Sequence, residues 1–249
     1  MKYFIIGIFF CFLAMNSYSQ TPVYLFQGDI DSGDQLNPED LHPWKPKQKV
    51  DYTGIYHFGE SEWEWDLLVI IDDSVVVAQA FLNDWGKVDR TADETWRRRE
   101  IVYRNVKCVQ NMIASDSLTA YFMEYKTQQN KITGMILPYN SSKIDTAEFG
   151  GRTTKDIKQF WFFKGEYPEL SWKIQNDTYF AIKSKEELQI MRNEIYARYG
   201  QRFAKNGKMY LHFYKKKWYQ PFRDNVQSCL TEIEVRNLAK INAINNQAN

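Results

Sequence analysis

The residues that most often carry chemistry are few in this chain, and their spacing matches no known catalytic or metal-binding motif. The three histidines, His42, His57 and His212, lie outside any HExxH motif and are not at metal-ligand spacing from a cysteine or from one another. The chain also lacks the GxSxG turn of serine hydrolases and a glycine-rich phosphate loop. Carboxylates are numerous, so a glycosidase pair stays open, but no spacing singles one out. We therefore expect a protein without catalytic activity, metal or cofactor.

Basic side chains in the last quarter of the chain indicate binding rather than catalysis. They lie among aromatic residues, and together they predict a basic, aromatic-edged surface that could hold an anionic polymer. The alternative for each of them is a solvated charge or a core aromatic. The candidate residues of this surface are Arg192, Arg198, Arg202, Lys215, Lys216, Lys217 and Trp218.

Tryptophans in the first half of the chain are the second group of binding candidates. Trp85 and Trp96 fall in predicted loops or at predicted strand ends, where exposed aromatics often bind ligands. In the stretch EWEW, Trp63 and Trp65 could stack on a sugar ring, because alternation places them on one face of a strand. The same alternation suits a hydrophobic core, and we favour the core for these two residues.

The chain begins with the pattern of a secretory signal peptide. Lys2 precedes an uncharged, largely apolar run over residues 3–15, and small or polar residues follow as far as Gln20. The apolar run is shorter than the roughly 20 residues that a membrane-spanning helix needs. We expect residues 1–20 to be removed and the rest to be exported to the periplasm, the outer surface or the medium, without a membrane span.

The overall charge is nearly balanced, with 32 Lys and Arg against 31 Asp and Glu, so nothing favours a nucleic-acid partner. The two halves differ, however, because residues from Lys183 onward hold 13 basic and 6 acidic side chains. We expect the oppositely charged halves to dock on each other; an anionic partner for the basic half is the alternative. Cys108 and Cys229, one in each half, could form a disulfide, but nothing in their spacing requires one, and two buried thiols are favoured.

Short runs rich in Val, Ile, Tyr, Phe and Trp dominate the chain from residue 51 to residue 180. Residues 21–50 before them are rich in Pro, Asp and Lys, and we expect an exposed lead-in there. The runs predict an antiparallel β meander that closes into a barrel or folds into a sandwich, possibly calycin-like. They are YTGIYHF, EWEWDLLVII, SVVVAQAFL, RREIVYRNVKCV, LTAYFMEYK, KITGMILPY and KQFWFF.

Residues 181–249 have a helical period instead, which makes the chain an α+β protein with a small helical second domain. Ser184 and Glu187 form a capping box that begins one helix, and Thr231 and Glu234 form a second box. Gly200 can take the left-handed conformation that ends the first helix. One apolar stripe lies along that helix, formed by Leu188, Met191, Ile195 and Tyr199.

Three segments of this second domain together resemble the YARHG domain over about residues 183–245. In order they are SKEELQIMRNEIYARYGQRF, YLHFYKKKWYQP and LTEIEVRNLAKI. Tyr196, Ala197, Arg198 and Gly200 stand where the family motif has them, whereas Tyr199 replaces its histidine. A role of that histidine in metal binding or proton transfer therefore does not carry over. The resemblance implies an exported bacterial protein of poorly defined activity at the cell envelope, often with a different N-terminal domain.

Each motif residue also has a sufficient structural role at the end of its helix. Arg198 can reach carbonyl groups that are freed there, and Gly200 turns the chain. Glu194 and Arg198 lie four residues apart in the favourable order, and a pair of this kind on a helix surface contributes about 0.2–0.5 kcal/mol. We therefore interpret the motif as a scaffold rather than a site.

The predicted function is non-catalytic binding or scaffolding at the bacterial cell envelope, with a cell-wall polymer or another envelope protein as the partner. One alternative is a carrier of a small apolar ligand, because the number of strands is similar to that of lipocalin-like barrels. An unfilled apolar interior larger than about 300 Å³ would favour it. An envelope hydrolase is the other alternative, and a pocket with two facing carboxylates that are not paired with Lys or Arg would favour that function.

Overall fold

The computed structural model describes residues 24–27, 34–60, 64–87, 94–128, 131–140 and 145–247, so the predicted signal peptide lies outside the described residues. An antiparallel sheet with nine strands in a row fills most of the first half. Their order across the sheet is β7-β6-β5-β4-β12-β11-β10-β9-β8. In chain order the strands are β4 (Gly54–Phe58), β5 (Trp65–Asp72), β6 (Val75–Lys87), β7 (Glu94–Val102), β8 (Lys107–Val109), β9 (Met112–Ala114), β10 (Thr119–Lys126), β11 (Lys131–Asn140) and β12 (Asp145–Arg152).

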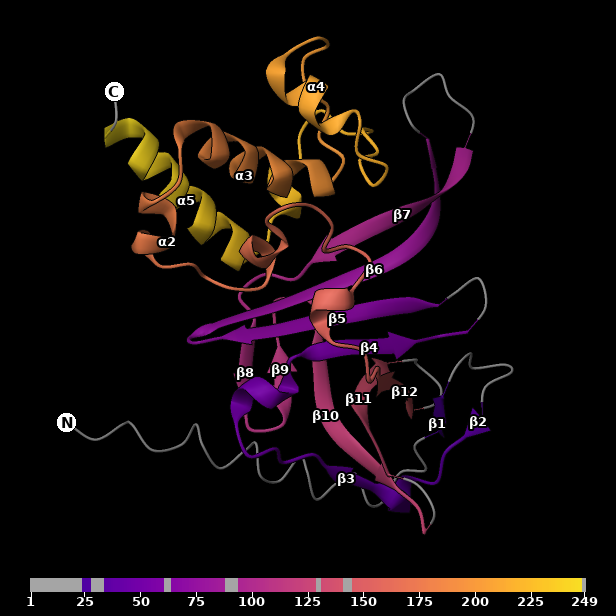
Figure 1. The fold of residues 1–249 in the computed structure, drawn as a ribbon. Helices are drawn as coiled ribbons and strands as arrows, with labels where there is room; N and C mark the ends of the chain where they lie inside the picture. The colour runs from indigo at the N-terminus through magenta and orange to yellow at the C-terminus, as the bar shows by residue number, and fades with distance from the viewer. Residues whose placement is uncertain are drawn as a thin grey trace, which may run out of the picture.

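The row of strands is a meander that curls into a half-barrel. Strands that follow each other in the chain pair from β4 to β7 and from β8 to β12, and β12 then pairs with β4. In Figure 1, β4–β7 run across the view whereas β8–β12 run down it, so the row bends where β12 meets β4. Among the described residues, β7 and β8 are the two ends of the row. The predicted α+β class and the antiparallel meander are confirmed.

The segment over residues 21–50 is not a plain lead-in, because its described residues add three short strands. β1 (Tyr24–Gln27) pairs with β12 in parallel, β2 (Asp34–Gln35) pairs with β1, and β3 (Leu41–Pro43) pairs with β10. β9 covers only the first part of β10, and β4 covers only the last part of β12. β1 and β3 therefore hydrogen-bond backbone groups on these two strands that their neighbours in the row leave unpaired.

One predicted strand is absent from the described sheet. The stretch KQFWFF over residues 158–163 forms the end of a 3-10 helix, η5 (Ile157–Gln159), followed by turns. Phe160 and Phe162 are buried and both contact the ring of Phe81 on β6. The run is apolar because it fills a core on the face of the sheet, and it adds no strand to the ladder.

Helices follow the sheet and lie together at one end of the molecule (Figure 1). The described α-helices are α2 (Asp177–Ala181), α3 (Lys185–Arg198), α4 (Lys208–Phe213) and α5 (Glu232–Gln247). Both predicted capping boxes are present: the Ser184 hydroxyl accepts from the Glu187 amide, and the Thr231 hydroxyl accepts from the Glu234 amide. The YARHG-like region is therefore helical, as its period predicts.

The central strands are buried on both faces, and this arrangement joins the two halves of the chain. On β5, Leu67 and Val69 face the inside of the half-barrel, whereas Leu68 and Ile70 face the helices. The outer core combines these sheet residues with apolar side chains of α3 and α5, such as Ile195. The expected docking of the two halves is confirmed, and they share an apolar core.

Candidate functional site

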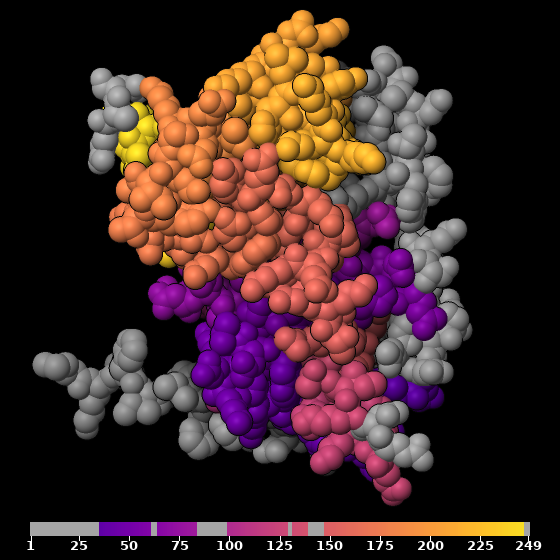
Figure 2. All heavy atoms as spheres, in the orientation of Figure 1, coloured from indigo at the N-terminus to yellow at the C-terminus, as the bar shows by residue number. Residues whose placement is uncertain are grey.

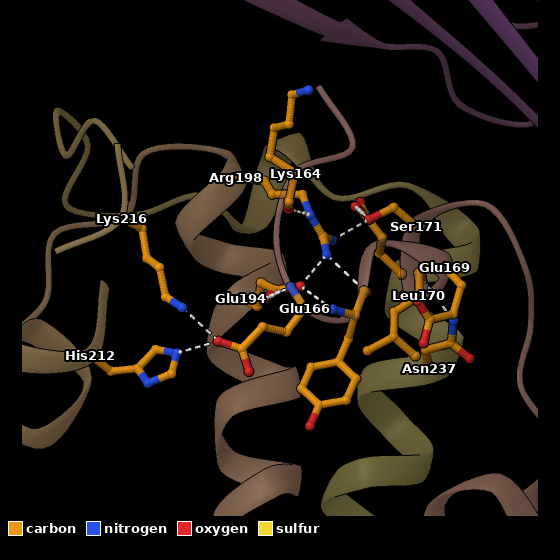
Figure 3. A network of polar contacts seen from close by, with 12 residues as sticks. Lys164, Glu166, Glu169, Leu170, Ser171, Glu194, Arg198, His212, Lys216 and Asn237 are labelled. Atoms are coloured by element: carbon orange, nitrogen blue, oxygen red, sulfur yellow. Dashed lines mark hydrogen bonds and ion pairs between the residues drawn. The ribbon is translucent and has the colours of Figure 1, made fainter. Parts of the chain in front are cut away.

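The arginine of the YARHG motif is the centre of a buried polar network (Figure 3). The Arg198 side chain has no exposed surface. Its Nε donates to the Lys164 carbonyl oxygen at 2.8 Å, and its Nη1 donates to Ser171 Oγ at 2.7 Å. Nη2 donates to the Tyr167 carbonyl oxygen at 2.9 Å and to Glu194 Oε1 at 2.6 Å. All three guanidinium nitrogens are therefore engaged inside the protein.

The carboxylate of Glu194 completes this arrangement from the same helix. It accepts hydrogen bonds from the backbone amides of Glu166, at 2.6 Å, and Tyr167, at 2.8 Å. The Glu194–Arg198 pair thus holds residues 164–167 against α3, because Glu194 binds two of their amides and Arg198 binds two of their carbonyls. The sequence predicted a weak pair, with Arg198 reaching carbonyls freed at the end of its own helix; the correction is that the pair is buried and that Arg198 binds carbonyls of a distant segment. A buried guanidinium needs partners for its donors, and here two carbonyls of that segment, the Ser171 hydroxyl and the Glu194 carboxylate provide them.

Tyr199, the residue in place of the motif histidine, connects the helices to the sheet. Its hydroxyl donates to Glu234 Oε2 on α5 at 2.8 Å and accepts from Gln79 Nε2 on β6 at 3.1 Å. Ser171 Oγ donates to the other oxygen of Glu234 at 2.6 Å, so the network continues to Arg198. Burial raises the pKa of Glu234, and burial together with the Glu234 charge raises the pKa of Tyr199. The phenol therefore stays protonated and can donate.

Gly200 ends α3 as predicted. Its φ of 77° lies in the left-handed region, and its carbonyl oxygen accepts from the amides of Phe222 and Arg223, both at 2.9 Å. A Cβ at this position would overlap the ring of Phe222. The glycine thus turns the chain and also brings residues 222–223 against the helix end.

The basic residues that the sequence groups into one surface are divided by the structure. Arg198 is buried and cannot belong to that surface, and Arg192 is half-buried. Arg202 forms an ion pair with Asp224 at 3.0 Å, and Lys216 forms one with Glu166 at 2.7 Å. The hydrogen bond from Lys216 is the main cause that lowers the pKa of Glu166. Two of the predicted cations are exposed, Lys215 and Lys217.

These two lysines adjoin an exposed aromatic face of α4. Tyr214 is 67% exposed and Leu211 is 53% exposed, and the ring of Tyr214 stacks on that of Tyr210 at 5.1 Å between centroids. We call this set the α4 surface; it consists of Tyr210, Leu211, Tyr214, Lys215 and Lys217. The stretch around it, residues 201–223, holds seven Lys and Arg and no Asp or Glu. In the space-filling view, α4 and the loop after it form the top of the molecule (Figure 2).

The opposite side of α4 is held by an aromatic cluster. Phe213 is fully buried and lies 5.3 Å from Phe203 and 5.8 Å from Tyr219 between ring centroids. Trp218, a predicted binding residue, is half-buried and packs against this cluster with Met209. It therefore supports the α4 surface from below, because its indole completes the core under the helix.

The other two tryptophan candidates lie on the sheet and not in loops. Trp85 on β6 and Trp96 on β7 are direct partners in the antiparallel register, so their positions share one face of the hairpin. Their side chains lie outside what the structure describes. The two residues lie side by side because β6 and β7 pair over a longer stretch than the sequence predicted.

A pocket of about 310 Å³ lies on the outer face of the sheet, and the sequence did not single it out. His57 on β4 pairs with Asp66 in the register of β5, and its Nδ1 lies 2.9 Å from Asp66 Oδ1. Its Nε2 lies 3.7 Å from Glu64 Oε2. The hydrogen bond to Asp66 is the largest cause that raises the pKa of His57. The lining includes His57, Glu64, Trp65, Asp66, Asn83 and Trp161.

The interior of the half-barrel bears on the prediction of a carrier. Inside the half-barrel, large side chains such as Tyr52, Tyr56 and Phe122 are buried and pack on one another, with Tyr52 and Phe122 stacked at 4.1 Å. This packing counts against the carrier of an apolar ligand. Glu64 and Asp66 line one pocket on the outer face and both contact His57, and these contacts do not decide between a binding protein and the hydrolase. No group of three His, Cys, Asp or Glu in the described residues could hold a metal ion. The two described cysteines, Cys108 and Cys229, are free thiols.

The fold and the buried network define an α+β protein whose curled antiparallel sheet carries a small helical domain on its outer face. That domain, over residues 166–246, matches the family model of the YARHG domain. The match begins earlier than the predicted residue 183, at Glu166, in the segment that Arg198 and Glu194 hold. A search of curated proteins and a search of solved structures found no match.

The YARHG domain is found in exported proteins, so its presence suggests export while leaving the activity unknown. Among the described residues, no helix combines the length and the apolar character that crossing a membrane requires. The resemblance that the motif residues carry is thereby confirmed for the C-terminal part of the chain.

Proposed function

We propose that this exported protein binds anionic cell-wall glycan at the bacterial envelope, without catalysis, through the α4 surface. The observation that carries the proposal is the exposed ring of Tyr214, stacked on the half-buried ring of Tyr210, in a stretch that has seven basic residues and no acidic one. Sugar rings present C–H groups that pack on aromatic faces, and the carboxylates of cell-wall material attract lysines. The periplasm or the outer surface is the compartment that this function requires.

The energetic logic favours several weak contacts over one strong contact. Lys215 and Lys217 are exposed, so salt screens their attraction for an anionic polymer over a distance of about 10 Å at 0.1 M. A repeating polymer offsets this weakness, because many copies of the protein can bind to the many sites along it. Binding should therefore be salt-dependent and should require the rings as well as the charges.

The supporting framework makes the α4 surface rigid before the ligand arrives. The aromatic cluster beneath it, with Phe203, Phe213 and Tyr219, fixes the orientation of α4. A pre-ordered surface loses less conformational entropy on binding than a flexible one. The polar groups of the network around Arg198 are bonded to other residues of the protein. This network therefore stabilises the scaffold, and the binding role falls to the α4 surface.

The test is co-sedimentation of the purified protein with insoluble peptidoglycan sacculi at low and at moderate salt. We expect the wild-type protein to pellet at low salt and to pellet less at moderate salt. Replacing Lys215 and Lys217 by Gln should reduce the pelleted fraction, and Tyr214→Ala should reduce it separately. Lys216 is left unchanged because it pairs with Glu166, which keeps the charge change confined to the α4 surface.

The matched control is the double substitution of Lys107 and Lys126 by Gln. Both lysines are exposed on strands of the sheet, so this variant loses the same charge at a distance from α4. It should pellet like the wild-type protein. Equal loss in both double variants would show a nonspecific charge effect and would end the proposal, as would the absence of wild-type pelleting at low salt. Release of soluble wall fragments by the protein would contradict the non-catalytic role.

A further inference from the structure

We propose that the pocket between His57, Asp66 and Trp161 is a binding subsite for one uncharged sugar ring of a glycan. The pocket lies on the outer face of β4, β5 and β6, beside the segment that carries Phe160 and Trp161. It belongs to the sheet and not to the helical domain, so it is independent of the α4 surface. The inference rests on the pocket's own shape and lining.

The lining combines the two kinds of group that a sugar ring needs. Asp66 and Glu64 supply carboxylate oxygens, which accept hydrogen bonds from hydroxyl groups, and Asn83 supplies an amide that both donates and accepts. Trp161 supplies indole surface for the apolar C–H face of the ring. The volume of about 310 Å³ lies at the small end of the range of roughly 300–1,000 Å³ for ligand pockets, which suits one or two rings.

Neighbouring residues hold these lining groups in place. Next to Asp66 on β5, the ring of Trp65 packs inside the half-barrel on that of Phe58, with centroids 4.5 Å apart and planes 13° apart, and so anchors this part of the strand. The indole of Trp161 is 40% exposed and meets the buried ring of Phe81 edge to face at 5.5 Å. Asp66 is fixed by His57 at 2.9 Å and its side chain is 25% exposed, so it can still accept from a ligand. The subsite is therefore largely formed before binding.

The position of His57 favours an uncharged ligand over a cation. The imidazole lies between both carboxylates of the pocket, within 2.9 Å of Asp66 and 3.7 Å of Glu64. A cationic ligand would have to compete with the imidazole for the same oxygens, whereas hydroxyl groups can use the remaining lone pairs. A metal ion is also disfavoured, because the described residues contain no cluster of three suitable ligands.

Isothermal titration of the purified protein with chitotriose, cellotriose and maltotriose tests the inference. We expect millimolar or tighter binding of at least one trisaccharide. For that sugar, Trp161→Ala and Asp66→Asn should each raise Kd at least about tenfold, which corresponds to about 1.4 kcal/mol. Asn83→Ala and Glu64→Gln change exposed side chains and should weaken binding less, and they keep the test valid if the first two variants misfold.

Tyr214→Ala serves as the control, because this exposed ring lies on the α4 surface and should leave trisaccharide binding unchanged. Two results would overturn the inference: no heat of binding with any of the three sugars at millimolar concentration, or equal affinity in the wild-type protein and all four pocket variants. Neither result touches the sacculus experiment, which depends on Tyr214, Lys215 and Lys217. The failures of the two proposals are therefore distinguishable.

Discussion

Arg198 shows that a charged motif residue can have a structural role rather than a role in binding or catalysis. Its guanidinium donates to two backbone carbonyls, one hydroxyl and one carboxylate, and it has no exposed surface. Such an ion pair forms in a low-dielectric interior, where the loss of one partner leaves the other charge uncompensated. The main energetic cost of removing Arg198 is therefore the buried carboxylate of Glu194 that would lose its ion-pair partner.

Arg198→Met should lower the free energy of unfolding by about 3–5 kcal/mol, because Glu194 would keep a buried charge without its ion-pair partner. Urea denaturation followed by tryptophan fluorescence measures the change. Arg202→Met is the matched control, since Arg202 pairs with Asp224 at an exposed site and should cost less than about 1 kcal/mol. Similar losses in the two variants would contradict the role of the buried network.

Tyr199→Phe isolates the hydroxyl that joins α5 to the sheet. It removes one donor to Glu234 and one acceptor for Gln79, while the buried ring stays in place. We expect a loss of about 1–3 kcal/mol in the free energy of unfolding, measured in the same urea titration. Tyr214→Phe, at an exposed ring, should change it by less than about 0.5 kcal/mol. An unchanged Tyr199→Phe variant would mean that the hydroxyl contributes nothing to the junction.

At the scale of elements, the helix boundaries were predictable because their signals are local. The Ser184–Glu187 box and the Gly200 terminator each involve residues close together in the chain. The partners of the buried network are remote: Gln79 and Tyr199 are 120 residues apart, and Arg198 and Lys164 are 34 apart. No local pattern specifies such pairs, so the sequence predicted a scaffold without predicting its contacts.

The missed strand β12 has an equally physical explanation. Its sequence, DTAEFGGR, has weak strand propensity because of its glycines and its acidic residues. A Cβ on Gly150 would overlap the ring of Phe58 on the inner face. The glycine is therefore required by a ring that packs on the backbone of the sheet, and that requirement is invisible without the pairing of β12 and β4.

Gly200→Ala should destabilise the protein strongly, because the backbone is left-handed there and the new Cβ would overlap Phe222. The backbone strain alone costs about 1–2 kcal/mol, and the overlap adds to it. Thermal unfolding followed by circular dichroism measures the effect as a lowered Tm. Gly151→Ala is the control: it has open space around the added Cβ and should leave Tm within a few degrees of wild type. Equal shifts in the two variants would contradict the proposed role of the helix end.

At the scale of the whole molecule, the sheet and the YARHG domain share one core. Polar contacts cross the same boundary: Arg223 pairs with Glu100 on β7 at 2.7 Å, and the amide of Ile174 donates to Asp72 at 2.6 Å. The apolar part includes Leu68 and Ile70 of the sheet. The sequence placed a domain boundary near residue 181, and apolar side chains from both sides of it lie in one core.

We therefore expect the two parts to unfold in a single cooperative transition. Tryptophan fluorescence and far-ultraviolet circular dichroism should give coincident urea curves, because loss of either part exposes the shared core to water. Arg223→Met should lower the midpoint of both curves together, since Glu100 would lose its ion-pair partner at the boundary. Two separate transitions, or a shift confined to one probe, would show that the domains are thermodynamically independent.

Tyr199, which stands in place of the motif histidine, ties the helical domain to the sheet beside it. Arg198 and Gly200 bond to residues of the helical domain and, for Arg198, to Lys164 just before it, whereas the hydroxyl of Tyr199 also reaches Gln79 on the sheet. The first two positions are thus tied to the domain itself, and the third is tied to its neighbour. Separated from this sheet, the helical domain would keep the bonds of Arg198 and Gly200 within it and lose the bond from Gln79 to the Tyr199 hydroxyl.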